Sequence, residues 1–98
     1  MDLNAVRERI NAIDDQIVDL FVERMKASAD VASAKAEKNL PVLDLRREQA
    51  VLEKVMERGG EEFEIYINKL YQTIFCNKIF FYLLIQLWLP TFLRPTGG

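Results

Sequence analysis

Apolar residues recur at alternating intervals of three and four positions over the first part of the chain. They are Leu3, Val6, Ile10, Ile13, Ile17 and Leu20. Only a helix places such positions along one side, and the interval is that of a coiled-coil seam. The same interval continues, without any Pro or Gly, through Arg24, Ala27, Val31 and Ala34. The pattern predicts a helix over about 3–39, which Pro41 ends by disfavouring helical geometry at Leu40.

This first helix would be on the order of 50 Å long at ~1.5 Å per residue, about twice the width of a compact domain of this chain length. A protomer of 98 residues cannot cover a seam of that length by itself. We therefore expect the chain to associate, with the seam facing a partner.

Two further helical patterns follow. Asp44 fits the N-cap of a helix over about 45–58, which Gly59-Gly60 ends. The apolar face of this helix comprises Val51, Leu52, Val55 and Met56. A third helix over about 62–89 begins with acidic residues, and its inward stripe runs through Ile67, Leu70, Tyr71 and Ile74. With no strand-like alternation, the pattern predicts an all-α, single-domain chain over 1–98 with a frayed tail at 90–98.

The end of the third predicted helix is almost wholly apolar. Between Ile79 and Leu89 only Tyr82 and Gln86 interrupt the run. At about 11 residues the run is shorter than the ~20 that a membrane-spanning helix needs. A buried helix end or a partner-facing segment is therefore favoured over membrane contact.

Composition narrows the possible chemistry. The chain has a net charge of -2, no His and one Cys, so it lacks the basic excess of nucleic-acid binders and can build neither His-based catalysis nor a His metal site. Cys76 lies in an apolar run, which favours a buried small hydrophobe over a nucleophile. The first residues lack the basic-then-apolar order of a signal peptide. We therefore expect cytoplasmic localisation, without membrane or nucleic-acid partners.

Several charges fall on faces where apolar residues are expected. Arg24 lies on the seam, and Lys35 follows about three turns later, which returns it to nearly the same face. Arg47 and Glu48 lie one turn before the apolar face of the second helix, next to Asp44. Taken singly, each charge fits a solvated or ion-paired side chain. Taken together, these charges converge beside a helix N-terminus, and the arrangement predicts an anion pocket for carboxylates or phosphate.

Arg7 and Arg24 start roughly 25 Å apart along one helix and can hardly share a small ligand within one chain. If two long helices pack antiparallel about a two-fold axis, Arg7 of one chain reaches the Arg24 and Lys35 region of the other. Two composite sites would result. The alternative, on spacing alone, is an exposed helix arginine that belongs to no site.

A set of polar positions gives the chain a family resemblance. The set comprises Arg7, Ile13-Asp14, Glu23-Arg24, Ala34-Lys35, Pro41-Val42, Asp44, Arg47 and Glu48. It resembles the all-helical, AroQ-type chorismate mutases, and the resemblance covers about residues 3–72. It implies a three-helix protomer, an intertwined homodimer and two equivalent sites that convert chorismate to prephenate in phenylalanine and tyrosine biosynthesis. No metal or cofactor is implied.

The resemblance also implies a substrate-binding set, namely Arg7, Arg24, Lys35, Asp44, Arg47 and Glu48. In the family the first of these comes from the neighbouring subunit, the other cations bind the carboxylates and the ether oxygen, and the acids approach the hydroxyl. Lys35, Arg24 and Glu48 are the implied catalytic residues. The reaction is a unimolecular, pericyclic Claisen rearrangement, so it needs neither a nucleophile nor a general base. Charge and shape suffice, with Lys35 donating to the ether oxygen as negative charge develops there.

The third helix departs from the family. In our alignment Lys78 stands where the family usually has a small polar residue, and Tyr82 where it has a Gln or Glu that bonds the ether oxygen. Helical spacing carries both along the inward stripe, so we expect both to border the site as substrate-binding residues. From about Phe75 onward the sequence looks unlike the family, as if its C-terminal segment had been replaced. We therefore expect weaker catalysis than in the family.

Two other functions fit the same residues. Isochorismate pyruvate lyase uses the same fold and a similar cationic pocket, and the residues alone do not separate the two substrates. The alternative outside enzymes is a non-catalytic helical dimer with a degraded site, because the apolar run over 79–89 suits packing against a partner. Binding of a bicyclic transition-state analogue distinguishes a working pocket from a degraded one.

Overall fold

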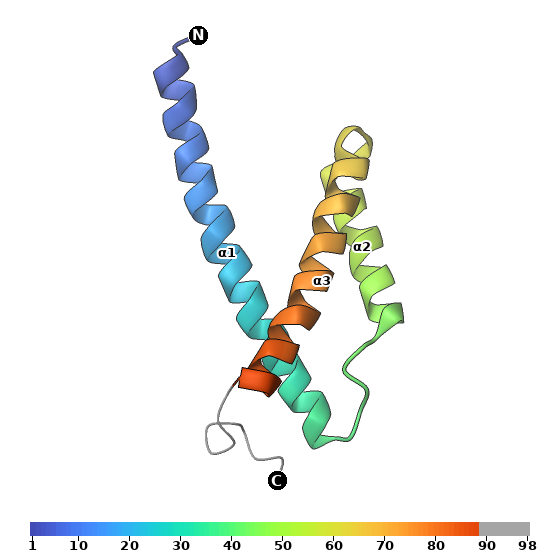
Figure 1. The fold of residues 1–98 in the computed structure, drawn as a ribbon. Helices are drawn as coiled ribbons and strands as arrows, with labels where there is room; N and C mark the ends of the chain where they lie inside the picture. Colours follow the sequence, from blue (N-terminus) through green and yellow to red (C-terminus); the bar gives the residue numbers. More distant parts are fainter. Residues whose placement is uncertain (89–98) are drawn as a thin grey trace.

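The computed structural model describes residues 1–88, which form three α-helices and one 3-10 turn (Figure 1). The bounds are Leu3–Glu37 for α1, Leu45–Gly59 for α2, Glu61–Phe63 for the 3-10 turn η1 and Glu64–Trp88 for α3. The prediction of an all-helical chain with a long first helix is confirmed. The predicted tail at 90–98 lies outside the described residues.

Helix α1 begins and ends on side-chain and backbone caps. The Asp2 carboxylate accepts a hydrogen bond from the Asn4 amide at 3.0 Å. At the other end, the Leu40 amide donates to the Lys35 carbonyl at 2.8 Å, and the Asn39 amide donates to the Ala36 carbonyl at 3.1 Å. Asn39 has a φ of 57°, and this left-handed residue closes a Schellman motif. The helix therefore ends two residues before the predicted position, because Asn39 leaves helical geometry before Pro41 acts.

Helices α2 and α3 form an antiparallel hairpin joined by Gly60 and η1. The Asp44 carboxylate accepts a hydrogen bond from the Arg47 amide at 3.0 Å, which confirms the predicted N-cap. Gly60 follows α2 with a φ of 87° and a ψ of 166°. Two of the acidic residues expected at the start of the third helix, Glu61 and Glu62, instead lie in the 3-10 turn. The third, Glu64, begins the regular α-helix.

The backbone at Gly60 gives a prediction for stability. Its φ and ψ lie in a region that is essentially reserved for glycine, so Gly60→Ala should lower the free energy of unfolding by about 1–3 kcal/mol. A Cβ at this position would meet open space, so the loss comes from the backbone alone. Urea unfolding of the variant, compared with Arg58→Ala at the end of α2, measures it. Equal midpoints for the two variants would contradict this strain.

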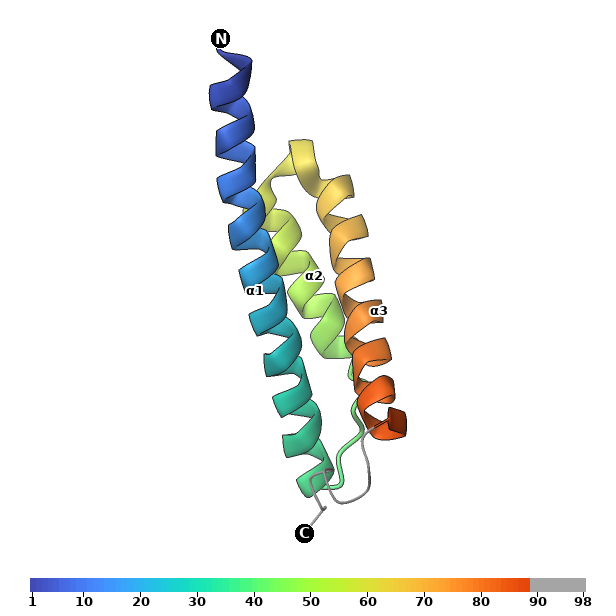
Figure 2. The same ribbon diagram turned by 60° about the vertical axis from the view of Figure 1, so that its left-hand side comes forward.

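Helix α3 packs against α2 and against the C-terminal half of α1, and the core is small (Figure 1, Figure 2). Among the described residues, the buried apolar side chains are Ala32, Leu52, Ile74 and Phe75. These come from all three helices, so the C-terminal half of α1 packs on the hairpin. The predicted inward stripe of α3 is correct at Ile74 but wrong at Leu70, which is 55% exposed. Leu70 faces outward because the rotation of α3 directs Phe75, rather than Leu70, toward α1.

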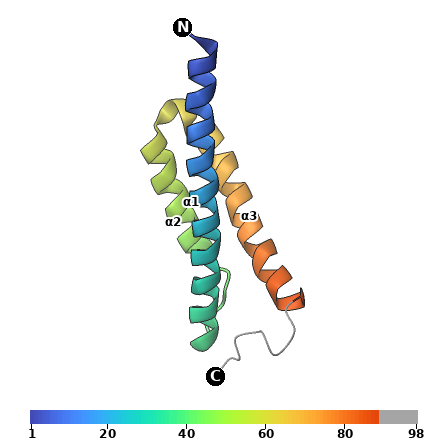
Figure 3. The same ribbon diagram turned by 90° about the vertical axis from the view of Figure 1, so that its left-hand side faces the viewer.

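The N-terminal part of α1 extends past the turn between α2 and α3 in all three views (Figure 3). Its large seam residues are between 47% and 62% exposed, namely Leu3, Ile10, Ile13, Ile17 and Leu20. The radius of gyration is 17.2 Å, against about 13 Å for a compact domain of this size. The single protomer thus leaves its seam uncovered, as the length of the helix predicts.

The apolar run of α3 is also uncovered in the protomer, as far as the structure describes it. Four of its side chains are between 38% and 62% exposed, namely Ile79, Phe80, Leu83 and Leu84. Of the two arrangements expected for this run, a helix end buried within one chain is therefore wrong for the described part of α3. Within residues 1–88, none of the helices is long and apolar enough to cross a membrane.

Candidate active site

A cavity of about 530 Å³ lies between the C-terminal half of α1, the α1–α2 connection, the start of α2 and the second half of α3. Seven of the predicted site residues line it, namely Arg24, Lys35, Asp44, Arg47, Glu48, Lys78 and Tyr82. Its walls are otherwise mainly apolar, from Ala27 and Val31 of α1 to Ile79 and Leu83 of α3. The arrangement combines concentrated charge with low-polarity walls, which suits a small anionic ligand.

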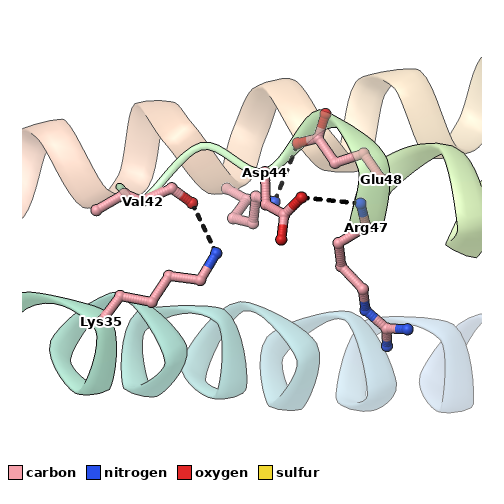
Figure 4. A network of polar contacts seen from close by, with 6 residues as sticks. Lys35, Val42, Asp44, Arg47 and Glu48 are labelled. Atoms are coloured by element: carbon pink, nitrogen blue, oxygen red, sulfur yellow. Dashed lines mark hydrogen bonds and ion pairs between the residues drawn. The ribbon is translucent and has the colours of Figure 1, made fainter. Parts of the chain in front are cut away.

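Lys35 is half-buried and belongs to the last turn of α1. Its Nζ donates a hydrogen bond to the carbonyl of Val42 at 3.2 Å (Figure 4). This contact ties α1 to the connection that leads into α2. An ammonium group carries three N–H donors, so the contact with Val42 leaves donors free for a ligand in the cavity.

Arg24 is held by two aromatic rings of α3. Its guanidinium carbon lies 5.6 Å from the centroid of the Tyr71 ring and 5.8 Å from that of Phe75. The two rings meet edge to face, with centroids 5.9 Å apart. Cation–π attraction therefore restrains a guanidinium that would otherwise have many rotamers. The sequence pattern did not indicate these two supports, although Tyr71 lies on the predicted inward stripe and Phe75 is adjacent to it.

The start of α2 brings three charged residues to the cavity. Asp44 caps the helix, and the side chain of Arg47 extends toward α1 (Figure 4). Glu48 lies on the other side of the helix, toward α3, in the same view. Amide groups in the first turn of a helix point outward from its N-terminus. Because the N-terminus of α2 borders the cavity, it adds positive potential to that of Arg47.

Lys78 and Tyr82 lie on α3 one turn apart and both face the cavity, as their spacing predicts. Lys78 Nζ forms an ion pair with Glu48 Oε1 at 3.1 Å. The same ammonium lies 5.4 Å from the centroid of the Phe75 ring. Lys78 is thus partnered, rather than an additional free cation beside Arg24 and Lys35.

Arg7 is the predicted site residue that the protomer does not bring to the cavity. It is exposed on the N-terminal part of α1, beyond the hairpin. This placement agrees with the expectation that Arg7 and Arg24 cannot share a small ligand within one chain. Among the described residues there is no group of three or more Cys, Asp or Glu side chains that could hold a metal ion.

Comparisons with known proteins identify the family. The family described as "Chorismate mutase type II" matches residues 6–79. The chain is 37% identical over 75 residues to the "Bifunctional chorismate mutase/prephenate dehydratase" of Buchnera aphidicola subsp. Schizaphis graminum, which covers 74% of this chain and 20% of that protein. The protein of the same description from Escherichia coli K12 is 35% identical over 79 residues, covering 79% of this chain and 20% of that protein.

A more distant relative of the same description, from Aquifex aeolicus, is 31% identical over 62 residues, or 63% of this chain and 17% of that protein. The chain therefore spans about a fifth of the length of the curated relatives it matches. No solved structure gives a significant match. The family match includes α1 from Val6 onward and the cavity-lining residues from Arg24 to Ile79, and on this ground the chain belongs to the type II chorismate mutase family.

Proposed function

We propose that this domain catalyses the Claisen rearrangement of chorismate to prephenate, a step in the biosynthesis of phenylalanine and tyrosine. The observation that carries the proposal is the cavity, in which Arg24, Lys35 and Arg47 converge between apolar walls. Chorismate is a dianion whose enolpyruvyl group must fold over its ring before reaction. A cavity that fixes two carboxylates close together selects this compact conformer, and selection of a reactive conformer lowers the barrier.

Each cation has a distinct part in the proposed reaction. Arg24, restrained by its two aromatic neighbours, binds one carboxylate, and Arg47 at the N-terminus of α2 adds to the attraction for the dianion. Lys35 donates a hydrogen bond to the ether oxygen while the C–O bond breaks. Negative charge grows on that oxygen only in the transition state, so this hydrogen bond strengthens as the barrier is approached.

The acids of the cavity fit the neutral polar group of the substrate. Glu48 and Asp44 are proposed to accept a hydrogen bond from the ring hydroxyl, because a carboxylate would repel the two carboxylates of chorismate but accepts from an O–H. Tyr82 faces the cavity at the position where the family usually places an amide or a carboxyl. Its phenol can donate a hydrogen bond but is rigid, so we expect lower activity than in family members with a Gln there.

The active form is proposed to be an intertwined homodimer. Two observations support it: the exposed seam of α1 and the distance of Arg7 from the cavity of its own chain. A second α1 packed antiparallel on the seam would cover the apolar residues and bring its Arg7 to the first chain's cavity. Each of the two sites would then contain four cations that can meet the substrate.

Dissociation of such a dimer should unfold the helices. Because much of the apolar surface of α1 is covered only by a second copy, we expect sedimentation to show a dimer that dissociates on dilution. Circular-dichroism helicity should fall over the same range of protein concentration. A folded monomer whose helicity does not depend on concentration would contradict this prediction.

The reaction itself is tested by following chorismate by absorbance and identifying the product by chromatography. We expect prephenate from chorismate and no pyruvate from isochorismate. Pyruvate release from isochorismate would assign the chain to the lyase alternative. A dimer that transforms neither compound and binds no bicyclic dicarboxylate analogue of the transition state would favour the non-catalytic alternative.

A further inference from the structure

The ion pair between Lys78 and Glu48 joins α3 to α2 at the edge of the cavity. Its two charged atoms lie 3.1 Å apart, and the side chains are only 27% and 17% exposed. We propose that Lys78 is a specificity-determining residue, which holds the Glu48 carboxylate so that the cavity selects dianionic ligands that also carry a hydroxyl group. This inference rests on the proposed function and deepens it.

The geometry leaves Glu48 able to bind a ligand. Lys78 Nζ bonds to Oε1, and a carboxylate has a second oxygen with its own lone pairs. With Oε1 fixed, the orientation of Oε2 is restricted, so a ligand hydroxyl meets an acceptor in a defined place. A hydrogen bond to a charged and oriented acceptor is stronger than one to a mobile acceptor.

Lys78 is itself restrained from a second direction. Its ammonium lies 5.4 Å from the centroid of Phe75, whose ring also attracts Arg24 at 5.8 Å. Phe75 is 6% exposed, so the ring is immobile in the packed core. The guanidinium of Arg24 and the ammonium of Lys78 therefore lie beside one fixed ring, which sets their positions relative to each other. The first is proposed to bind a carboxylate of the ligand, and the second orients Glu48.

Charge balance gives a second reason for the pairing. A half-buried carboxylate without a partner of its own would turn toward a neighbouring cation, because an unpaired charge in such a place is costly. In this cavity the neighbours include Arg24, Lys35 and Arg47, which the dianionic ligand requires. Lys78 supplies Glu48 with a cation on the α3 side and so keeps the acid from competing with the ligand carboxylates.

The test compares two ligands on one protein. The dimeric protein is titrated by calorimetry with a bicyclic dicarboxylate that carries the ring hydroxyl, and with its analogue that lacks the hydroxyl. The unmodified chain should prefer the hydroxylated ligand by about tenfold or more, the value of one charge-assisted hydrogen bond. In Lys78→Met, which keeps the unbranched apolar part of the side chain and removes the ammonium, the preference should fall to within about threefold, and Lys78→Arg should restore most of it.

A matched control and a double-mutant cycle separate specificity from folding. Lys69→Met removes a cation from the exposed part of α3, outside the cavity, and should leave the preference unchanged. In a Glu48→Gln background, Lys78→Met should have no further effect on the ratio of the two affinities, because both changes remove the same interaction. A general loss of fold or of anion attraction would lower both affinities together and leave their ratio intact.

The outcomes are distinguishable. If the unmodified chain binds neither dicarboxylate, the proposed function is wrong and this inference falls with it. If the chain binds both ligands and Lys78→Met keeps the full preference for the hydroxyl, the proposed function stands and the role of Lys78 is refuted. The role of Lys78 is also refuted if the effects of Lys78→Met and Glu48→Gln on the ratio are additive.

Discussion

Lys35→Ala should lower kcat for chorismate by about 100- to 1,000-fold, the usual effect of removing one donor to a developing negative charge. Lys35 is half-buried in the cavity wall and contacts Val42, which holds its ammonium in place before any ligand arrives. In the proposed mechanism the hydrogen bond from Lys35 to the ether oxygen strengthens in the transition state, so the loss should appear mainly in kcat rather than in KM. Steady-state absorbance assays of the purified protein measure both constants.

One control variant and one stability measurement make this result specific. Lys38→Ala removes a cation one turn further along, which is exposed and outside the cavity, and should have nearly full activity. Lys35→Ala also removes the contact with the carbonyl of Val42, so its stability to urea must be measured alongside. A variant that folds, dimerises and retains more than about a tenth of the kcat would show that another group donates to the ether oxygen.

The sequence predicts the helices well because their signals are local. The periodicity of the seam and the cap at Asp44 depend on residues within a few turns of one another, and the structure agrees with both. The predicted end of α1 lies two residues beyond the observed end, because the left-handed conformation of Asn39 is only one of several that Asn allows. Pro41 shows that a helix must stop but not at which residue.

The lining of the cavity was also predictable in large part. Arg24 and Lys35 share a face of one helix, while Lys78 and Tyr82 share a face of another, so spacing alone groups each pair. What spacing does not determine is how the helices rotate against each other. The pairing of Lys78 with Glu48 and the aromatic contacts of Arg24 depend on that rotation. The same dependence explains why Leu70 faces outward.

The second large effect concerns Arg7, the predicted site residue that lies outside the cavity of its own chain. Arg7→Ala and Arg24→Ala should each lower kcat/KM by about 100-fold or more, because each removes a charge-assisted contact to a substrate carboxylate. In a dimer with composite sites, a chain with Arg7→Ala still offers an intact cavity, and a chain with Arg24→Ala still offers an intact Arg7. One site of the heterodimer then contains both arginines, and the other contains neither.

Mixing the two inactive variants should therefore restore activity. After unfolding and refolding together in equal amounts, about half of the dimers are heterodimers with one working site out of two, so about a quarter of the activity of the unmodified protein should return. A mixture of Arg24→Ala with Lys35→Ala is the matched control, since both residues line the cavity of the same chain and every site in that mixture lacks one of them. If heterodimers are shown by mass spectrometry and the first mixture stays as inactive as the control, Arg7 does not act across the interface.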